Sequence, residues 1–255
     1  MEKVILITGG SRGIGAATAR LAASQAYAVA VNYTANSLAA DEVVRSIRAA
    51  GGTAITVQGD VANESDVVAM FKKVDAKLGR LTALVNNAGV VDVTSRVDAM
   101  SLERLQRMFA INVFGSFMCA REAVKRMSTL YGDRSGNGNG NGGSIVNVSS
   151  AAARLGAPGQ YVDYAAAKAA IDTFTLGLAK EVAGEGIRVN AVRPGLIETD
   201  IHASGGLPNR VRDLTPSVPM QRAGTAQEVA EAIVWLLGET SSYTTGSLLD
   251  VTGGR

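Results

Sequence analysis

The stretch Val4–Gly15, VILITGGSRGIG, constrains the fold of this chain more than any other part of it. Its first four residues are apolar and mostly β-branched, which is typical of a strand buried on both faces of a parallel sheet. Gly9, Gly13 and Gly15 follow, and from Ile14 onward apolar and small residues are spaced as in a helix. A strand, a glycine turn and a helix form the first half of a nucleotide-binding unit, in which a pyrophosphate rests on the helix N-terminus.

The spacing of these glycines, G-x-x-x-G-x-G, is not diagnostic by itself. The common dinucleotide fingerprint, G-x-G-x-x-G, would require glycine at Ser11 and Ile14. Glycine-rich turns also occur without a ligand, because glycine permits tight backbone conformations. The function therefore has to be inferred from the residues that follow this turn.

The composition excludes several classes of protein. With 255 residues, a formal net charge of +2 and scattered charges, the chain has no basic footprint for nucleic acid or an anionic membrane. No apolar run at the N-terminus is long enough for a signal peptide or a membrane span. The single cysteine, Cys119, excludes an intrachain disulfide, and we expect it to be buried. Since there is also only one histidine, we expect no metal site, and we expect a cytoplasmic protein.

Strand-like and helix-like segments alternate along the whole chain. This alternation predicts a single α/β domain over residues 1–255, built as a Rossmann-like, doubly wound parallel sheet of about seven strands with helices on both faces. The expected strands are Val4–Thr8, Ala28–Tyr33, Ala54–Gln58, Ala83–Asn86, Ser144–Val148, Arg188–Val192 and Ser247–Val251. The expected helices are Ala16–Ser24, Leu38–Ala50, Glu64–Leu78, Leu102–Met127, Tyr164–Ala183 and Ala226–Leu237.

Two segments between these elements need a separate interpretation. Residues 132–143 are rich in glycine and asparagine and precede the fifth expected strand, so we expect a flexible surface insertion at the edge opposite any ligand. A role of this insertion in binding a partner is the alternative. Residues 198–222 follow the sixth expected strand, and we expect them to form a substrate lid. For His202, within this lid, packing in the lid or in an oligomer is favoured over catalysis.

Small or polar residues follow four of the expected strands. Asp60 follows the third strand, Asn86–Gly89 the fourth, Ser149 and Ser150 the fifth, and Pro194–Gly195 the sixth. One such ending is ordinary turn chemistry, but the carboxyl ends of parallel strands share one edge of a sheet, where ligands bind. Their repetition therefore indicates one extended site.

Tyr164 and Lys168 are four residues apart in an expected helix, so their side chains share a face. Such a pair alone is usually a surface pair. Here the motifs of the chain occur in the order found in the short-chain dehydrogenase/reductase family, which the sequence resembles over essentially its whole length. This resemblance implies a nicotinamide cofactor and transfer of a hydride to or from a small-molecule carbonyl or alcohol. The residues that carry it are Thr8–Gly15, Asn86–Gly89, Asn112, Ser150, Tyr164, Lys168 and Pro194–Gly195.

The resemblance assigns catalytic roles to four residues. Tyr164 would give a proton to the nascent alkoxide in reduction, and Ser150 would hydrogen-bond the substrate oxygen. A free phenol has a pKa near 10, so work near neutrality requires a drop of roughly 2–3 units, or about 3–4 kcal/mol. An ammonium about 4 Å away supplies about 4 kcal/mol at an effective dielectric constant of about 20. Lys168 alone could therefore suffice, with the oxidised nicotinamide adding to its effect, and Asn112 would anchor a water linking Lys168 to solvent.

Two of these assignments have alternatives. In many family members the serine lies one residue closer to the tyrosine, and counting back from Pro158 instead favours Ser150 over Ser149. Asn112 could simply bend or cap the helix in which it lies.

The end of the second strand indicates which nicotinamide is bound. An acidic residue about twenty positions after the glycine turn would accept the ribose 2′-hydroxyl of NAD, but no acid occurs there before Asp41. Arg12 lies within the turn, where a guanidinium can meet a 2′-phosphate, so we expect NADP(H). By the resemblance, Asp60 would bind the adenine, and Ile197 and Thr199 would hold the carboxamide. The residues expected to contact the cofactor are Gly9, Ser11, Arg12, Gly13, Ile14, Gly15, Asn32, Tyr33, Thr34, Asp60, Val61, Asn87, Ala88, Gly89, Tyr164, Lys168, Pro194, Gly195, Ile197 and Thr199.

The predicted function is accordingly that of an NADPH-dependent carbonyl reductase. The alternatives within the family are 3-oxoacyl-carrier-protein reductases and glucose-dehydrogenase-like sugar dehydrogenases. Glu185 stands where carrier-protein reductases have a basic docking residue, although Lys125 and Arg126 lie nearby. A non-catalytic NADP(H) sensor is a further alternative, but such proteins lose the tyrosine or the lysine. The resemblance also implies a homotetramer.

Overall fold

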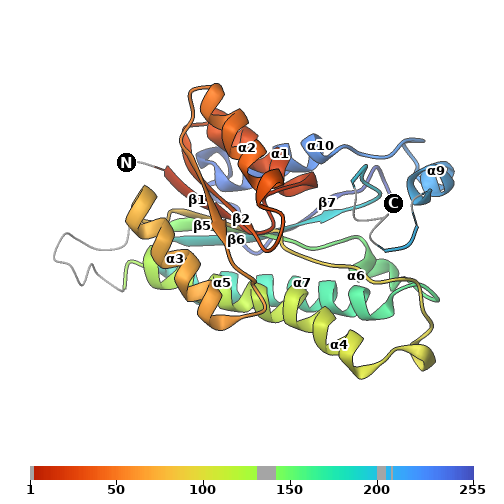
Figure 1. The fold of residues 1–255 in the computed structure, drawn as a ribbon. Coiled ribbons are helices and arrows are strands. Elements are labelled where there is room, and N and C mark those ends of the chain that lie inside the picture. Colours follow the sequence, from red (N-terminus) through yellow and green to blue (C-terminus); the bar gives the residue numbers. More distant parts are fainter. Residues whose placement is uncertain (1–2, 131–141, 200–204, 208) are drawn as a thin grey trace.

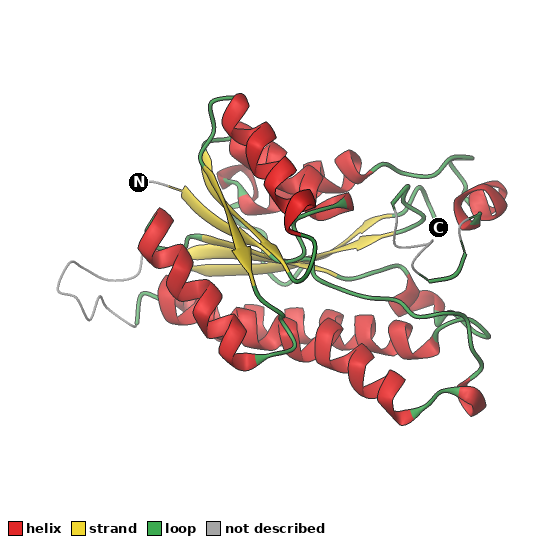
Figure 2. Ribbon diagram, in the orientation of Figure 1, coloured by secondary structure: helices red, strands yellow, loops and turns green. Residues whose placement is uncertain are grey.

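The computed structural model describes residues 3–130, 142–199, 205–207 and 209–255 (Figure 1). Strands and helices alternate in it along the chain, as Figure 2 shows. The strands are β1 (Lys3–Ile7), β2 (Tyr27–Tyr33), β3 (Ala54–Gln58), β4 (Ala83–Asn86), β5 (Gly143–Val148), β6 (Ile187–Pro194) and β7 (Leu248–Val251). The helices are α1 (Gly13–Ser24), α2 (Ser37–Ala49), α3 (Glu64–Leu78), α4 (Leu102–Phe109), α5 (Gly115–Met127), α6 (Ala152–Leu155), α7 (Val162–Val182), α9 (Arg210–Leu214) and α10 (Ala226–Leu237).

The strands form one sheet in the order β3-β2-β1-β4-β5-β6-β7, and all neighbouring strands are parallel. Helices α1, α2 and α10 cover one face of the sheet, and α3, α5 and α7 cover the other (Figure 1). The expected doubly wound α/β sheet is thus confirmed.

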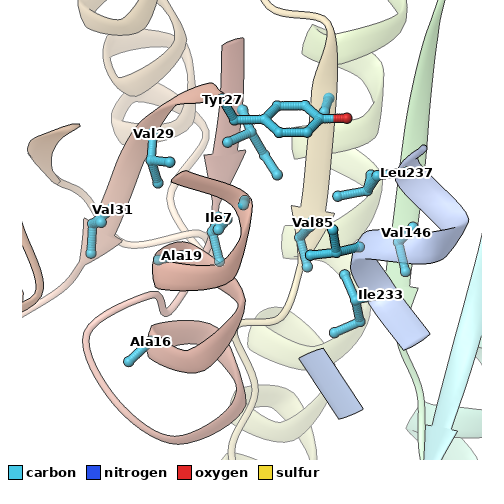
Figure 3. Close-up of a cluster of buried hydrophobic side chains, with 14 of the residues drawn as sticks. Ile7, Ala16, Ala19, Tyr27, Val29, Val31, Val85, Val146, Ile233 and Leu237 are labelled. Atoms are coloured by element: carbon cyan, nitrogen blue, oxygen red, sulfur yellow. The ribbon is translucent and has the colours of Figure 1, made fainter. Parts of the chain in front are cut away.

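Alternate residues of each central strand point into two separate cores. Ile5 and Ile7 of β1 pack toward α1, α2 and α10, and Figure 3 shows that core, to which Ala16 and Ala19 of α1 contribute. Val4 and Leu6 belong to the core on the opposite face, with residues of α3, α5 and α7. Because helices cover both faces, the central strands are apolar throughout, as the N-terminal run predicts.

The strand order reverses between β1 and β4. β1 pairs with β2 on one side and with β4 on the other, with Ile5 opposite Ala83 in the second pairing. Connections on either side of such a point lead to helices on opposite faces and leave a crevice at the carboxyl edge, where ligands of these sheets bind. The glycine turn after β1 and the polar residues after β4 therefore meet at this crevice.

The segment Leu102–Met127 differs from its expectation as one uninterrupted helix. Between α4 and α5 the structure has a π-helical turn, Ala110–Phe114. The side-chain amide of Asn112 donates to the main-chain oxygens of Met108 and Val90, both at 3.0 Å. A side-chain donor that enters the helical hydrogen-bond ladder distorts it, and π-helical turns are frequent at functional sites.

Parts of two predicted segments lie outside the described residues. They are residues 132–141 of the expected insertion and residues 200–204 and 208 of the expected lid, with His202 among them. The described end of the insertion lies at the amino edge of the sheet, since Gly142 N donates to Met127 O at 3.1 Å just before β5 begins. No helix in the described part of the chain is long and apolar enough to cross a membrane.

A buried ion pair holds the first turn of α7 against α4. Arg104 donates to both carboxylate oxygens of Asp163, at 2.8 and 3.2 Å, and to the main-chain oxygen of Val93 at 2.6 Å. The Asp163 side chain is 0% exposed and that of Arg104 is 10% exposed. The pair therefore fixes the helix that carries Tyr164, one residue further along.

We expect Asp163→Asn to lower the free energy of unfolding by about 3 kcal/mol, because it leaves the buried Arg104 without a counter-charge. Asp98→Asn is the matched control, since the Arg96–Asp98 pair is exposed and such pairs contribute about 0–1 kcal/mol. Urea denaturation of the two variants and the parent protein measures both losses. Two equally small losses would contradict a stabilising role of the Arg104–Asp163 pair.

Candidate active site

A cavity of about 440 Å3 opens at the carboxyl edge of the sheet. Ser150, Tyr164 and Lys168, three of the four expected catalytic residues, line it. Its wall also contains about half of the residues that were expected to bind the cofactor. These are Ile14, Asn87, Gly89, Tyr164, Lys168, Pro194, Gly195, Ile197 and Thr199.

Hydrogen bonds from the end of β4 hold the glycine turn in place. The side-chain amide of Asn87 donates to the main-chain oxygens of Thr8 at 2.8 Å and Gly9 at 3.0 Å. The main-chain amides of Asn87 and Ala88 donate to Thr8 Oγ1, at 2.9 and 3.0 Å. Only glycine fits at position 15, because a Cβ on Gly15 would lie 2.5 Å from Gly9 O and 2.6 Å from Asn87 Nδ2.

The backbone of this turn forms a cradle at the start of α1. Gly9 and Gly13 have φ angles of +60° and +53°, in the left-handed region that favours glycine. Because α1 begins at Gly13, the N–H groups of its first turn have no helical acceptor. A Cβ on Gly13 would lie 3.4 Å from Thr199 Cγ2, so the segment after β6 passes beside the turn. The cradle suits a pyrophosphate.

Asn32, expected to contact the cofactor, instead faces the interior. It is 1% exposed, and its Oδ1 accepts a hydrogen bond from Gly9 N at 3.0 Å. Its Nδ2 donates to the main-chain oxygens of Val57 at 3.2 Å and Gly59 at 2.9 Å. The whole amide is thus used inside the protein, and we infer that Asn32 positions the glycine turn from beneath.

The residues expected to distinguish NADP from NAD lie at the surface around the turn. Arg12 is exposed, and within the described residues no hydrogen bond or ion pair holds its side chain. Ser11 and Tyr33 are half-buried, and Thr34 is exposed. The acid-free end of β2 therefore lies open to solvent beside a guanidinium that is available to an anion.

Asp60 and Val61 shape the turn after β3. Asp60 Oδ1 accepts a hydrogen bond from Ala62 N at 2.9 Å. Val61 is 4% exposed and packs against Gly115, where a Cβ would lie 2.8 Å from Val61 Cγ2. The close approach of α5 to this turn therefore depends on the missing side chain at position 115.

The two adjacent serines have different environments. Ser149 is 2% exposed, and its hydroxyl donates to the main-chain oxygen of Lys168 at 3.1 Å. Ser150 Oγ accepts a hydrogen bond from Ala152 N at 3.1 Å, and its hydroxyl also interacts with that of Tyr164. Ser150 is thus the serine whose hydroxyl faces that of Tyr164, and its contact with a substrate oxygen stays a prediction.

Tyr164 and Lys168 lie one turn apart on α7. Lys168 is 5% exposed, its Nζ donates to Val148 O at 2.8 Å, and it lies 5.6 Å from the centroid of the Tyr164 ring. Burial raises the pKa of Tyr164 to about 12, while the hydrogen bond with Ser150 acts in the opposite direction. Burial also lowers the pKa of Lys168 to about 8, against the effect of the Asp172 carboxylate, which raises it.

The expectation that Lys168 alone could lower the pKa of Tyr164 toward neutrality is not met by this arrangement. The ammonium is directed at a main-chain carbonyl, and the desolvation of the phenol outweighs the favourable interactions around it. An additional positive charge in the cavity would act to lower the pKa of Tyr164.

Asn112 lies behind the cavity rather than in its wall. It is 0% exposed, and its Oδ1 accepts a hydrogen bond from Val90 N at 3.2 Å while its Nδ2 donates to Val90 O. A Cβ on Gly89 would lie 2.8 Å from this Oδ1 and 3.4 Å from Lys168 Nζ. Asn112 thus fixes the segment after β4 close to Lys168, and its role as a water anchor stays a prediction.

The cavity also contains residues that the sequence did not reveal. Tyr161 packs edge-on against Tyr164, with ring centroids 5.8 Å apart and an interplanar angle of 89°. Gln160, Arg210 and Arg255 line the same cavity. No spacing rule connects them, since they come from three separate segments, and only the position of Arg210 in the expected lid could have drawn attention to it.

Comparisons with known proteins agree with this architecture. A family model described as "Enoyl-(Acyl carrier protein) reductase" matches residues 9–255. The chain is 55% identical over 252 residues to "Uncharacterized oxidoreductase YgfF" of Escherichia coli (strain K12), and the alignment covers 99% of each chain. It is 39% identical over 253 residues to a 3-oxoacyl-(acyl-carrier-protein) reductase of Synechocystis sp., with 99% of this chain and 96% of that protein covered.

Solved structures give the same result. A mutant of a Serratia marcescens short-chain dehydrogenase/reductase superposes with a TM-score of 0.88 at 30% sequence identity. The superposition covers 99% of this chain and 97% of that one.

The depressed pKa of the buried lysine leads to a prediction about stability. Lys168 has a pKa of about 8 in the folded protein and an ordinary value of 10.5. Between these pH values the unfolded chain binds more protons, so this group makes the wild-type fold more stable as the pH rises. Below pH 8 the charged lysine costs the fold about 3 kcal/mol, at about 1.4 kcal/mol per pKa unit, and its hydrogen bond to Val148 returns about 1 kcal/mol.

We therefore expect Lys168→Met to be more stable than the wild type by about 2 kcal/mol at pH 7, and to lose this advantage as the pH approaches 10.5. Urea denaturation at pH 7 and pH 10 checks the difference. Lys180→Met, which replaces an exposed lysine of the same helix, should change stability little at either pH. A pH-independent difference for Lys168→Met would show that folding does not lower the pKa of Lys168.

Proposed function

The chain belongs to the short-chain dehydrogenase/reductase family and is an oxidoreductase, and on this premise we propose that it is an NADPH-dependent carbonyl reductase. Its reaction would be the transfer of a hydride between nicotinamide and a carbonyl or secondary alcohol. The observation that carries this proposal is the convergence of Ser150, Tyr164 and Lys168 on one cavity, beside a glycine cradle.

The residues around the cradle fit a dinucleotide. The first turn of α1 and the backbone near Gly9 would hold the pyrophosphate, and Ile197 and Thr199 would border the nicotinamide. When bound, the cofactor supplies or accepts the hydride, and its oxidised form adds a positive charge to the cavity. That positive charge would lower the pKa of Tyr164.

The protein side chains would handle the substrate oxygen and the proton. Ser150 and Tyr164 interact through their hydroxyls and can both donate to one carbonyl oxygen. With a pKa raised to about 12, Tyr164 keeps its proton at neutral pH and can give it to an alkoxide, which is more basic than a phenolate. The arrangement therefore suits reduction directly. Alcohol oxidation at neutral pH would require a lower pKa of Tyr164, which is the direction in which the charge of the oxidised cofactor acts.

We expect Tyr164→Phe to lower the turnover of carbonyl reduction by at least about 100-fold, because it removes the proton donor and keeps the ring. NADPH affinity should stay within a few-fold, since the cradle is unchanged. Tyr27→Phe is the matched control, because Tyr27 is also buried but begins β2, at the amino edge of the sheet. Steady-state kinetics and a fluorescence titration with NADPH give both quantities. Near-wild-type turnover of Tyr164→Phe would overturn the mechanism.

The preference for NADPH rests on the surface around Arg12. This exposed guanidinium lies in the turn before α1, and β2 ends without an acid that could accept the 2′-hydroxyl of NAD. A 2′-phosphate would gain charge-assisted hydrogen bonds from such a guanidinium.

We expect Arg12→Ala to weaken NADPH binding by about tenfold or more and NADH binding by less than about twofold, in line with the loss of a hydrogen bond between charged groups. Arg20→Ala serves as the control, because Arg20 is an exposed arginine further along α1 that donates to Ser46 Oγ. Titration of each protein with both cofactors decides the matter. Equal losses for NADPH and NADH would show that Arg12 does not read the 2′-phosphate.

Docking of an acyl carrier protein receives less support. Lys125 Nζ pairs with Glu122 at 2.8 Å, and Arg126 pairs with both Glu122 and Asp75. The two basic residues that could have recognised an acidic carrier are therefore engaged within the chain, and Glu185 adds a negative charge nearby. We accordingly favour a free small molecule as the substrate.

The lining of the cavity argues against a non-catalytic sensor. Leu155, Ala157 and Leu207 contribute apolar surface to it, beside the polar side chains of Gln160 and Arg210. The simultaneous presence of Tyr164 and Lys168 speaks against a sensor that binds NADP(H) without turnover.

We further propose a homotetramer in the cytoplasm. Phe114, Phe117 and Leu176 are exposed by 58%, 46% and 39% on the outward surface of the helical layer that contains α5 and α7. β7 forms an edge of the sheet, and Trp235 on the neighbouring α10 is 45% exposed. Apolar surfaces and an open edge of this kind are typical of subunit interfaces. The single cysteine, buried and with a pKa raised to about 12 by burial, is in keeping with a reducing compartment.

A further inference from the structure

Two guanidinium groups reach the substrate end of the catalytic cavity. Arg210 begins α9, and Arg255 follows β7 at the end of the described chain. Both are half-buried and both line the cavity, together with Gln160, Tyr161 and Leu207. Neither belongs to the glycine cradle, and their role is not explained by hydride transfer.

Arg210 is held at a defined place relative to the reacting hydroxyl. Its Nη1 donates to Gln160 Oε1 at 2.8 Å, and its Cζ lies 5.0 Å from the centroid of the Tyr161 ring. That ring in turn packs edge-on against Tyr164, at 5.8 Å between centroids. One aromatic ring thus separates the guanidinium from the expected proton donor, a span that a small substrate can bridge.

Arg210 differs from the other partly buried arginines of the structure. Arg104 and Arg193 pair with buried carboxylates, those of Asp163 and Asp172. Arg188 donates to the main-chain oxygens of residues 236, 237, 238 and 244. Among the described residues, Arg210 has only Gln160 as an acceptor and no carboxylate within ion-pair distance.

A cation that is partly withdrawn from water without a counter-ion is energetically unfavourable. Burial lowers the pKa of Arg210, and the nearby charge of Arg255 lowers it further. The backbone of Arg255 is held in place, since its main-chain oxygen accepts a hydrogen bond from Arg154 at 3.0 Å. The fold therefore places two guanidinium groups in the lining of one cavity, an arrangement that an anion would stabilise.

We propose that Arg210 and Arg255 bind an anionic group of the substrate, a carboxylate or a phosphate, separated from the reacting carbonyl by a short apolar spacer. The proposal rests on the proposed reductase function and names its substrate class. Arginine forks match both oxyanions, Gln160 orients the guanidinium, and Leu155 and Leu207 would contact the spacer.

The test compares oxo acids with their neutral counterparts. Reduction of 3-oxobutanoate, 4-oxopentanoate and 5-oxohexanoate by NADPH is measured beside that of their methyl esters, and dihydroxyacetone phosphate beside dihydroxyacetone. We expect kcat/KM of the best anion to exceed that of its neutral counterpart by about tenfold to a hundredfold, as for a hydrogen bond between charged groups. Preference for the phosphate over all acids assigns the site to phosphate, and the reverse assigns it to carboxylate.

Arg210→Met should lower kcat/KM for that anion by the same factor and leave its neutral counterpart within about twofold, with NADPH affinity unchanged. Arg210→Lys should retain part of the preference for the anion over its neutral counterpart, because it keeps the charge but loses the two-pronged guanidinium. Arg212→Met is the matched control, because Arg212 lies on the same helix, is 76% exposed and pairs with Asp213. Arg255→Met should reduce the preference as well.

A binding measurement separates this proposal from the reductase function. Neither pentanoate nor inorganic phosphate can be reduced. Calorimetric titration with pentanoate, or with inorganic phosphate if the phosphate substrate is the preferred one, should show binding that Arg210→Met abolishes. The anion site is refuted, while the reductase function stands, if carbonyls are reduced with the same kcat/KM for anions and their neutral counterparts. The same holds if Arg210→Met leaves the ratio of these two kcat/KM values unchanged. If no carbonyl is reduced but the anion binds through Arg210, the anion site stands and the reductase proposal falls. If neither occurs, both are wrong.

Discussion

The hydrogen bonds between Thr8 and Asn87 are the constraint on which the geometry of the site depends. β1 and β4 are neighbours in the sheet but distant in the sequence, and the residues that follow them are drawn together by these bonds. The contact is possible only because Gly15 lacks a side chain. The turn after β1 and the cavity consequently share one wall, which includes Ile14 and Asn87.

The ion pairs near the cavity form a connected series rather than isolated pairs. Asp172, one turn beyond Lys168 on α7, pairs with Arg193 at 2.8 Å. Arg193 also approaches Asp250 of β7 at 3.8 Å, and Asp250 pairs with Arg154 at 3.2 Å. The series leads from the neighbourhood of Lys168 to the segment that carries Arg255. The electrostatic environment of the lysine and the position of the carboxyl-terminal segment are thus linked through α7, β6 and β7.

The sequence allowed the fold and part of the cavity wall to be predicted, because both depend on local patterns. Alternation of strands and helices determined the layers, and the spacing of Tyr164 and Lys168 placed both on one face of α7. Features that depend on packing could not be derived in this way. The amide of Asn32 turns inward because four main-chain groups on three different segments compete for it, among them Gly9 N and Gly59 O. No sequence pattern encodes that competition.

The same reason accounts for the π-helical turn and for the protonation of the cavity. The helix around Asn112 is interrupted by bonds to Val90, a residue in a different segment, so the apolar periodicity of the helix gives no sign of the break. The pKa of Tyr164 depends on how much water is excluded around it, which only the assembled cavity determines. Arg210 became recognisable as part of the site only after the fold had brought it to Tyr161.

The position of Arg255 in the wall of the cavity also has a practical consequence. Figure 1 shows the two ends of the chain on opposite sides of the molecule, and β1 begins at Lys3 on the amino edge of the sheet. A peptide joined after Arg255 would start in the lining of the cavity, beside Arg154. An affinity tag or a surface-immobilisation linker therefore belongs ahead of β1, which begins at the edge of the sheet opposite the cavity.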